Sequence, residues 1–302
     1  MAFDISNLSA YVDENREELI GASLLKGKTI DVINHMAGVK GSAALNLLDV
    51  DVTFQDGSTC GFNASGDDEF SQRLMETKQV KVEKEWCVRT LIGTWAQQNA
   101  RVRVHGGDEL PFEEFILAKI AEAVNEKIEV CSWQGNASSP AIAGLLDQMI
   151  AASITPTALT AATDLAKIME VYNAIPEEVL EKAVIFVDAA RFRGAVNELV
   201  VANLYHYNPE APVDEFTLPG TNTRVIKVNG LNNASITSGG NTYTKFIFAG
   251  DPDKLFYGYD VEDDKRNFVL RYDEKNDTMW FRLVFNMGFQ VAIPSEVAFY
   301  SE

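Results

Sequence analysis

The chain has 302 residues, of which 46% are hydrophobic, and its formal net charge is -18 at pH 7. A chain of this length can bury a large core and divide into two domains, while its negative charge argues against a general nucleic-acid binder. The three cysteines lack disulfide or CxxC spacing, and we find neither a signal peptide nor an apolar run that could cross a membrane, so we expect folding in a reducing cytosol.

Residues 1–42 form a polar segment with little core of its own. Ser9 is placed to cap a short helix that has Tyr11 and Leu19 on one side. Glycines interrupt the apolar pattern that follows. We therefore expect this arm to pack on something other than itself.

Residues 45–100 carry strand patterns. Val80, Val82 and Trp86 alternate with charged residues, which is the period of a half-buried strand. A turn signal lies at Gln55–Ser58. Together they predict a long charged ribbon, which needs a neighbour because an isolated ribbon is poorly stable in water.

The clearest helix spans Pro111–Val130. Apolar residues recur at every fourth position, and Pro111 suits the first helical turn. At 1.5 Å per residue the helix would be about 30 Å long, enough to act as the strut of a domain. Gly135 marks its exit. The residues of the apolar row are Phe112, Ile116, Ile120, Val124 and Ile128.

A mixed block and a strand-rich region complete the chain. The block has helical patterns over 144–154, 158–172 and 188–204, with a short buried-type strand at 183–187. From Phe216 onward strand patterns dominate, and Asn286-Met287-Gly288 is interpreted as a turn between two long final strands. The predicted fold class is α+β.

Catalytic and metal-binding motifs are not found. His35, His105 and His206 lack metal-ligand spacing. The Gly57–Gly61 stretch fits a hairpin loop better than a nucleophile elbow, and the acidic residues near Asp251 lack the glycine of a calcium loop. We expect no enzyme activity, no catalytic residue, no metal and no cofactor.

The order of these parts resembles the major capsid proteins of tailed bacteriophages, the Hong Kong 97-like (HK97-like) fold. Leu110–Asn136 resembles that family's spine helix and its polar glycine turn, and Leu47–Leu91 resembles its extended loop, the E-loop. Phe246–Tyr259 resembles the family's late "GD" turn. The resemblance covers nearly the whole chain and relies on order and spacing.

The resemblance implies a domain plan. Residues 1–42 would be an N-terminal arm and 43–100 an E-loop, a long β-hairpin. Residues 101–142 and 265–292 would form a peripheral domain with the spine helix at 111–130. Residues 143–264 and 293–302 would form an axial domain.

It also implies a structural function. The chain would self-assemble into hexamers and pentamers of an icosahedral phage head that encloses double-stranded DNA, without sequence-specific binding and without a membrane. It would be made in the host bacterial cytoplasm and end in the virion. A portal protein is another implied partner. Because about a hundred residues before the spine helix leave no room for a built-in scaffold, the resemblance implies either a separate scaffolding protein or none.

Candidate site residues are therefore interface residues. Apolar side chains of the arm would bury surface between subunits, and charges of the ribbon would meet opposite charges on a neighbour. Some family members cross-link an E-loop lysine to an asparagine, although solubilising edge lysines are the simpler interpretation here. The expected residues are Phe3, Ile5, Leu8 and Tyr11 in the arm, and Lys78, Lys81, Glu83, Lys84 and Glu85 on the ribbon.

Two alternatives stay open. An encapsulin-type nanocompartment shell would keep the fold and hold a cargo enzyme in place of DNA. A cytosolic α/β enzyme would place its site where Asp188, Arg191 and Arg193 follow a buried strand, since such strand ends often carry sites.

Overall fold

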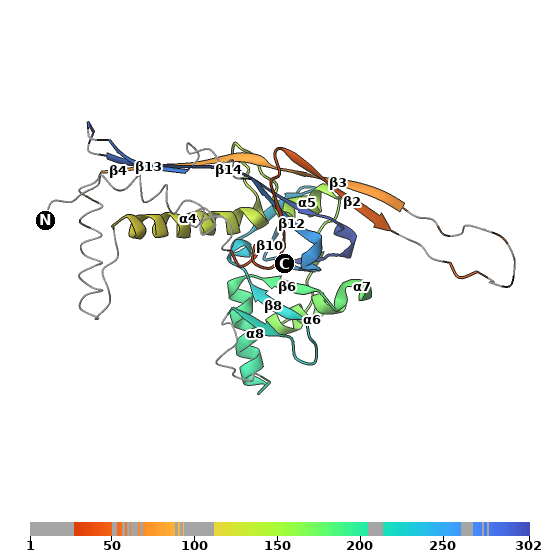
Figure 1. The fold of residues 1–302 in the computed structure, drawn as a ribbon. Helices are drawn as coiled ribbons and strands as arrows, with labels where there is room; N and C mark the ends of the chain where they lie inside the picture. Colours follow the sequence, from red (N-terminus) through yellow and green to blue (C-terminus); the bar gives the residue numbers. More distant parts are fainter. Residues whose placement is uncertain are drawn as a thin grey trace.

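The protein is described here from a computed structural model, which describes residues 27–49, 53–55, 58, 61, 66, 69–87, 90, 93, 112–204, 214–260, 268–273, 275–276 and 278–302. Two sheets form the body, and one long helix, α4 (Phe112–Gln134), runs along the first sheet and ends against the second (Figure 1). A β-hairpin projects from the opposite side of the body.

The first sheet has five strands built around β14 (Thr278–Val291). Strands β12 (Leu255–Asp260) and β13 (Phe268–Asp273) pair antiparallel with successive parts of β14, and β4 (Lys78–Cys87) pairs with it as well. Strand β1 (Asn34–Ala37) runs parallel to β12 at the edge. One strand of 14 residues therefore organises the whole layer.

Helix α4 confirms the predicted helix at 111–130 and extends it to Gln134. Ile116, Ile120, Val124 and Ile128 are all buried in the main core, as their spacing predicted. The helix ends at Gly135, whose φ of 65° favours glycine. The Phe112 side chain lies outside the described residues.

The second sheet has six strands in the order β5-β15-β11-β6-β8-β7. Residues of β6 alternate between two cores: Phe186 packs toward α4, and Ile185 packs toward helices α6 and α8. This two-sided burial explains the uninterrupted apolar run predicted at 183–187. The strands are β5 (Thr157–Ala158), β15 (Ala298–Ser301), β11 (Ile247–Gly250), β6 (Val184–Val187), β8 (Arg224–Lys227) and β7 (Glu215–Thr217).

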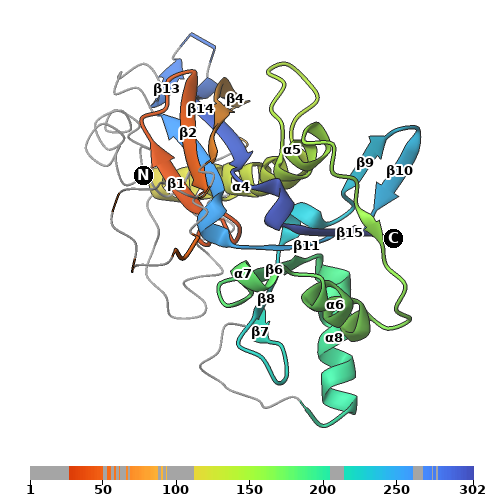
Figure 2. The same ribbon diagram turned by 90° about the vertical axis from the view of Figure 1, so that its right-hand side faces the viewer.

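Helices and small elements complete this layer (Figure 2). Helices α6 and α8 lie together on one face of the six-stranded sheet. A two-stranded hairpin, β9–β10, turns at Gly239 and Gly240, which both have positive φ. The bounds are α5 (Leu145–Ala151), α6 (Asp164–Asn173), α7 (Glu177–Leu180), α8 (Ala189–Val201), β9 (Ser235–Ser238), β10 (Asn241–Thr244), η1 (Asn229–Leu231), η2 (Pro252–Lys254) and η3 (Pro294–Glu296).

The ribbon expected over 43–100 is divided in the structure. The projecting hairpin consists of β2 (Ser42–Asp49) and β3 (Glu69–Glu76), while β4 leaves it to join β14. The charged alternation of β4 therefore belongs to a strand of the body. Its inner residues are partly buried because they face α4, a contact that the sequence pattern alone does not identify.

The later residues of the predicted arm pack on the body. Thr29, Ile30 and Ile33 are buried, and β1 belongs to the five-stranded sheet. Residues 27–37 are therefore part of the body. The 1–26 part of the predicted arm lies outside the described residues.

The turn expected at Asn286-Met287-Gly288 is wrong, because β14 runs straight through it. Gly288 lies opposite Gly258 of β12, and β3 crosses over both. A Cβ on Gly288 would lie 2.1 Å from the Glu76 carbonyl oxygen, and one on Gly258 would lie 2.4 Å from the Met75 Cε. The glycine thus allows close packing inside a strand.

Candidate functional site

The hairpin β2–β3 carries an unusual outward face, which we call the outward stripe. Three cross-strand pairs form it: Leu48 with Phe70, Asn46 with Gln72, and Ala44 with Leu74. The Phe70 side chain is 78% exposed, and Leu48 and Leu74 are each 56% exposed. The amide pair in the centre is hydrogen-bonded, with Gln72 Nε2 donating to Asn46 Oδ1 at 2.9 Å.

The opposite face of the hairpin is anchored in the body. Leu45 and Met75 are buried in a small cluster with Val39. Arg73 Nη1 donates to the Val291 carbonyl oxygen at 3.2 Å. Because a one-residue shift would exchange the two faces, this anchoring fixes which side chains point outward.

Exposed apolar side chains in such a row indicate an interaction surface. Each of these side chains, if buried by a partner, would contribute about 1.5–3 kcal/mol. The sequence pattern predicts a charged ribbon in this region and does not identify the apolar surface. A usable signal is present, because Phe70 and Leu74 are four residues apart in one strand and therefore lie on the same face.

The expected ribbon residues lie on both sides of β4. Lys81 and Glu83 form an ion pair of 2.7 Å on the exposed side, where Arg282 also contacts Glu83 at 2.8 Å. These contacts lower the pKa of Glu83 below its usual value, with the Lys81 hydrogen bond as the largest cause. Lys78 pairs with Glu76 at 3.1 Å. These charges meet partners within their own chain.

Lys84 and Glu85 make no ion pair within the described part of the chain. Lys84 lies at a cleft of about 930 Å³ between α4 and the five-stranded sheet. Val82 and Trp86 of β4 and Phe115 of α4 line the same cleft. The arm residues Phe3, Ile5, Leu8 and Tyr11 lie outside the described residues, so their interface role stays a prediction.

The residues considered for an enzyme site make structural contacts at the start of α8. Asp188 caps α8, its Oδ1 accepting from the Arg191 backbone N–H at 2.9 Å. Arg193 Nε donates to the Ala189 carbonyl oxygen at 3.1 Å. Both interactions stabilise the first turns of α8.

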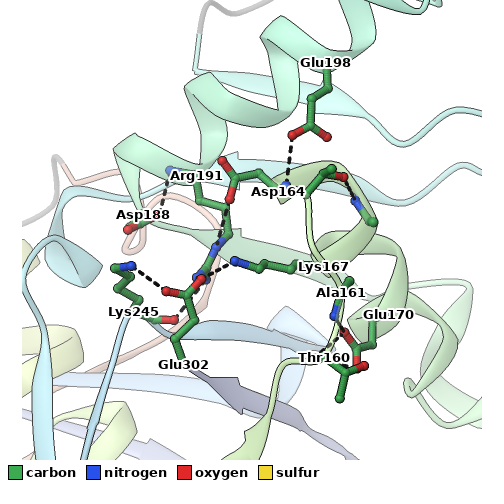
Figure 3. A network of polar contacts seen from close by, with 12 residues as sticks. Thr160, Ala161, Asp164, Lys167, Glu170, Asp188, Arg191, Glu198, Lys245 and Glu302 are labelled. Carbon is green, nitrogen blue, oxygen red and sulfur yellow. Dashed lines mark hydrogen bonds and ion pairs between the residues drawn. The ribbon is translucent and has the colours of Figure 1, made fainter.

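Arg191 belongs to a cationic network around Glu302 (Figure 3). The Arg191 side chain is only 3% exposed, and its Nη2 donates to Glu302 Oε1 at 3.0 Å. Lys245 Nζ lies 2.5 Å from the other carboxylate oxygen, and Lys167 pairs with the same group. Hydrogen bonds from Lys167 and Lys245 lower the pKa of Glu302 to about 2. The network ties the last strand to α6 and α8.

Among the described residues, no group of three or more His, Cys, Asp or Glu side chains could hold a metal ion. Burial raises the pKa of the Cys131 thiol to about 11, so it is no reactive thiolate. The Gly57–Gly61 stretch lies largely outside the described residues. No described helix combines the length and apolar character needed to span a membrane.

Comparison with solved structures shows that the chain has the fold of phage capsid proteins. A chain of Gordonia phage Cozz superposes with a TM-score of 0.54 at 13% identity, covering 91% of this chain and 86% of the other. A chain of the satellite phage P4 procapsid, a structure that includes the size determination protein, gives 0.53 at 10% identity, covering 96% and 98%.

A third likeness is to the capsid of the empty GTA particle, with a TM-score of 0.54 at 12% identity, covering 92% of this chain and 91% of the other. No protein-family model matches the sequence, and no curated protein matches it. The likeness is therefore one of fold, over nearly the entire length of each chain.

Proposed function

We propose that this protein is the major capsid protein of a tailed phage, with copies forming the hexamers and pentamers of an icosahedral head around double-stranded DNA. The observation that carries the proposal is the shared fold with chains of phage particles, which extends over about nine tenths of both partners. The outward stripe supports it, because a shell subunit needs exposed surface to bury against its neighbours.

The shape of the molecule favours head-to-tail association. The hairpin β2–β3 projects from one side of the body, while the N-terminal end of α4 and the end of the β4–β13–β14 layer point away on the other (Figure 1). A surface that meets a different surface on the next copy makes a heterologous contact, and such contacts generate closed rings when the rotation closes. We infer that the hairpin packs on the body of the next subunit, as an E-loop does.

The remaining interface residues belong to the same proposal. The arm set, Phe3 to Tyr11, would bury apolar surface between subunits, and Lys84 and Glu85 remain available for charged contacts there. A portal protein and a separate scaffolding protein would complete the head. In this proposal the peripheral part contributes α4, β13 and β14, and the axial part contributes the six-stranded sheet together with β12, which joins the five-stranded sheet.

Negative-stain electron microscopy of the purified full-length chain, after size exclusion, tests the function. We expect closed shells, or rings of five and six subunits. Particles from native lysate should contain double-stranded DNA, whereas a co-purifying cargo protein in its place would favour a nanocompartment shell. A stable monomer that never assembles, even when crowded or given a scaffold, would overturn the proposal.

A further inference from the structure

A buried acidic side chain lies where the two sheets meet. Glu129, near the end of α4, is only 5% exposed. Its Oε1 accepts from the Thr29 hydroxyl at 2.6 Å, and its Oε2 accepts from the Thr29 backbone N–H at 3.1 Å. The proposed function gives this carboxyl group no role.

The hydrogen bonds form a chain with one direction. Trp133 Nε1 donates to Thr29 Oγ1 at 2.6 Å, and an indole N–H can only donate. With the carboxyl group ionised, the Thr29 hydroxyl in turn donates to Glu129 Oε1. A proton on Glu129 would give up one of the two hydrogen bonds from Thr29 but would remove the buried charge. The ionised form keeps both bonds at the cost of that charge, and burial makes the charge the larger of the two costs.

Glu129 joins parts of the chain that are distant in sequence. Trp133, one turn later, packs against Phe186 and Phe248 of the six-stranded sheet, with ring centroids 5.2 Å away in each case. Residues 27–33 lead directly into β1 of the five-stranded sheet. The contact between Thr29 and Glu129 therefore lies at the junction of the two layers.

The charged groups that act on Glu129 come from residues 27–33, the segment that also contains Thr29. Lys28 and Asp31 are the charges that act on it, and they have opposite signs. Lys28 is itself held 3.3 Å from Asp214, which also pairs with Lys227 of β8. The turn η1, which packs against the same end of α4, carries no charged side chain.

We propose that Glu129 is a proton-dependent coupling residue, which holds residues 27–33 to the junction of the two sheets more firmly when it carries a proton than when it is ionised. The hydrogen bonds from Thr29 couple residues 27–33 to Glu129. The burial of Glu129 makes this contact sensitive to protonation. Burial raises the pKa of Glu129 above its usual value, and the Thr29 hydrogen bonds oppose this only in part. This inference does not depend on the shell function.

The direction of the effect follows from the raised pKa. A folded state that binds the proton more tightly than the open state is stabilised below the open-state pKa, and this stabilisation is lost as pH rises through the folded-state pKa. Rising pH should therefore favour openings that hydrate Glu129. The opening constant can change by about tenfold for each unit by which the two pKa values differ.

Hydrogen exchange of the full-length chain between pH 5 and pH 8.5 tests the proposal, with rates corrected for intrinsic exchange. For the wild type we expect the opening constant of residues 27–37 to rise with pH and then level off. Glu129→Gln should abolish this rise, whereas Glu126→Gln, an exposed residue of the same helix, should retain it. A flat wild-type profile, or the same slope in Glu129→Gln, would overturn the proposal.

A second variant covers the case in which Glu129→Gln does not fold. Thr29→Val removes the hydroxyl donor but keeps the backbone N–H, so it should shift the rise to higher pH. Infrared spectra of the wild type should show a protonated carboxyl band that persists above the titration of the exposed carboxyl groups. An unshifted profile in Thr29→Val, or a band that disappears together with the exposed groups, would contradict the proposal.

Discussion

At the scale of single residues, the Glu302 carboxylate is an acid-sensitive contribution to stability. Hydrogen bonds from Lys167 and Lys245 lower the pKa of Glu302 from its ordinary value near 4.5 to about 2. The stabilisation from the ionised carboxylate is therefore fully present above pH 4.5 and is lost as pH falls toward 2. Glu302→Gln should lower the free energy of unfolding by about 1 kcal/mol at pH 7, a value discounted for solvent screening.

Urea unfolding of the two proteins at several pH values measures this difference. The gap between wild type and Glu302→Gln should narrow between pH 5 and pH 3. Glu122→Gln is the matched control, because the pair between Glu122 and Lys119 is exposed and should contribute little. A gap that stays constant with pH would show that the loss comes from packing and not from the carboxylate charge.

The sequence does not predict the role of a residue whose type fits two different local structures. Gly288 fits a turn or a close approach between strands, and only the crossing of β3 decides in favour of the latter. Thr29 and Glu129 are ordinary polar residues in the sequence, yet they meet across 100 positions. Periodicity predicted α4 and β6 well, because each pattern reflects local burial, whereas long-range pairing leaves no local pattern.

At the scale of elements, the outward stripe of β2–β3 should matter for assembly and little for folding. The variant Leu48→Thr, Phe70→Thr, Leu74→Thr keeps strand-forming residues but removes most of the exposed apolar surface. We expect a change of no more than about 0.5 kcal/mol in the free energy of unfolding, because surface substitutions are usually small. Assembled particles should decrease at least about tenfold, since one lost contact of 1.4 kcal/mol already has that effect.

Sedimentation of assembled and dispersed protein, together with urea unfolding, measures both quantities. Asn46→Ser with Gln72→Ser is the matched control, because these residues occupy the centre of the same stripe without contributing apolar surface. The control should assemble nearly as the wild type does. Normal particles from the triple threonine variant would exclude the stripe as an interface.

At the scale of the whole molecule, a net charge of -18 opposes the association of many identical copies. Two electrostatic effects compete here: general repulsion, which salt screens, and specific ion pairs between subunits, which salt weakens. The ion pairs within the chain indicate which of the two effects is larger. Lys78, Lys81 and Glu83 are already paired within the chain, so few ribbon charges remain for a neighbour.

Repulsion should therefore dominate, and the protein concentration at which particles first form should fall as ionic strength rises from about 0.05 M to about 0.5 M, where the screening length falls from more than 10 Å to only a few ångströms. Light scattering across a concentration series measures this threshold. Sucrose serves as the uncharged control, because it strengthens apolar burial without screening. If sucrose has the same effect, burial and not charge sets the threshold; if salt raises the threshold, ion pairs between subunits outweigh the repulsion.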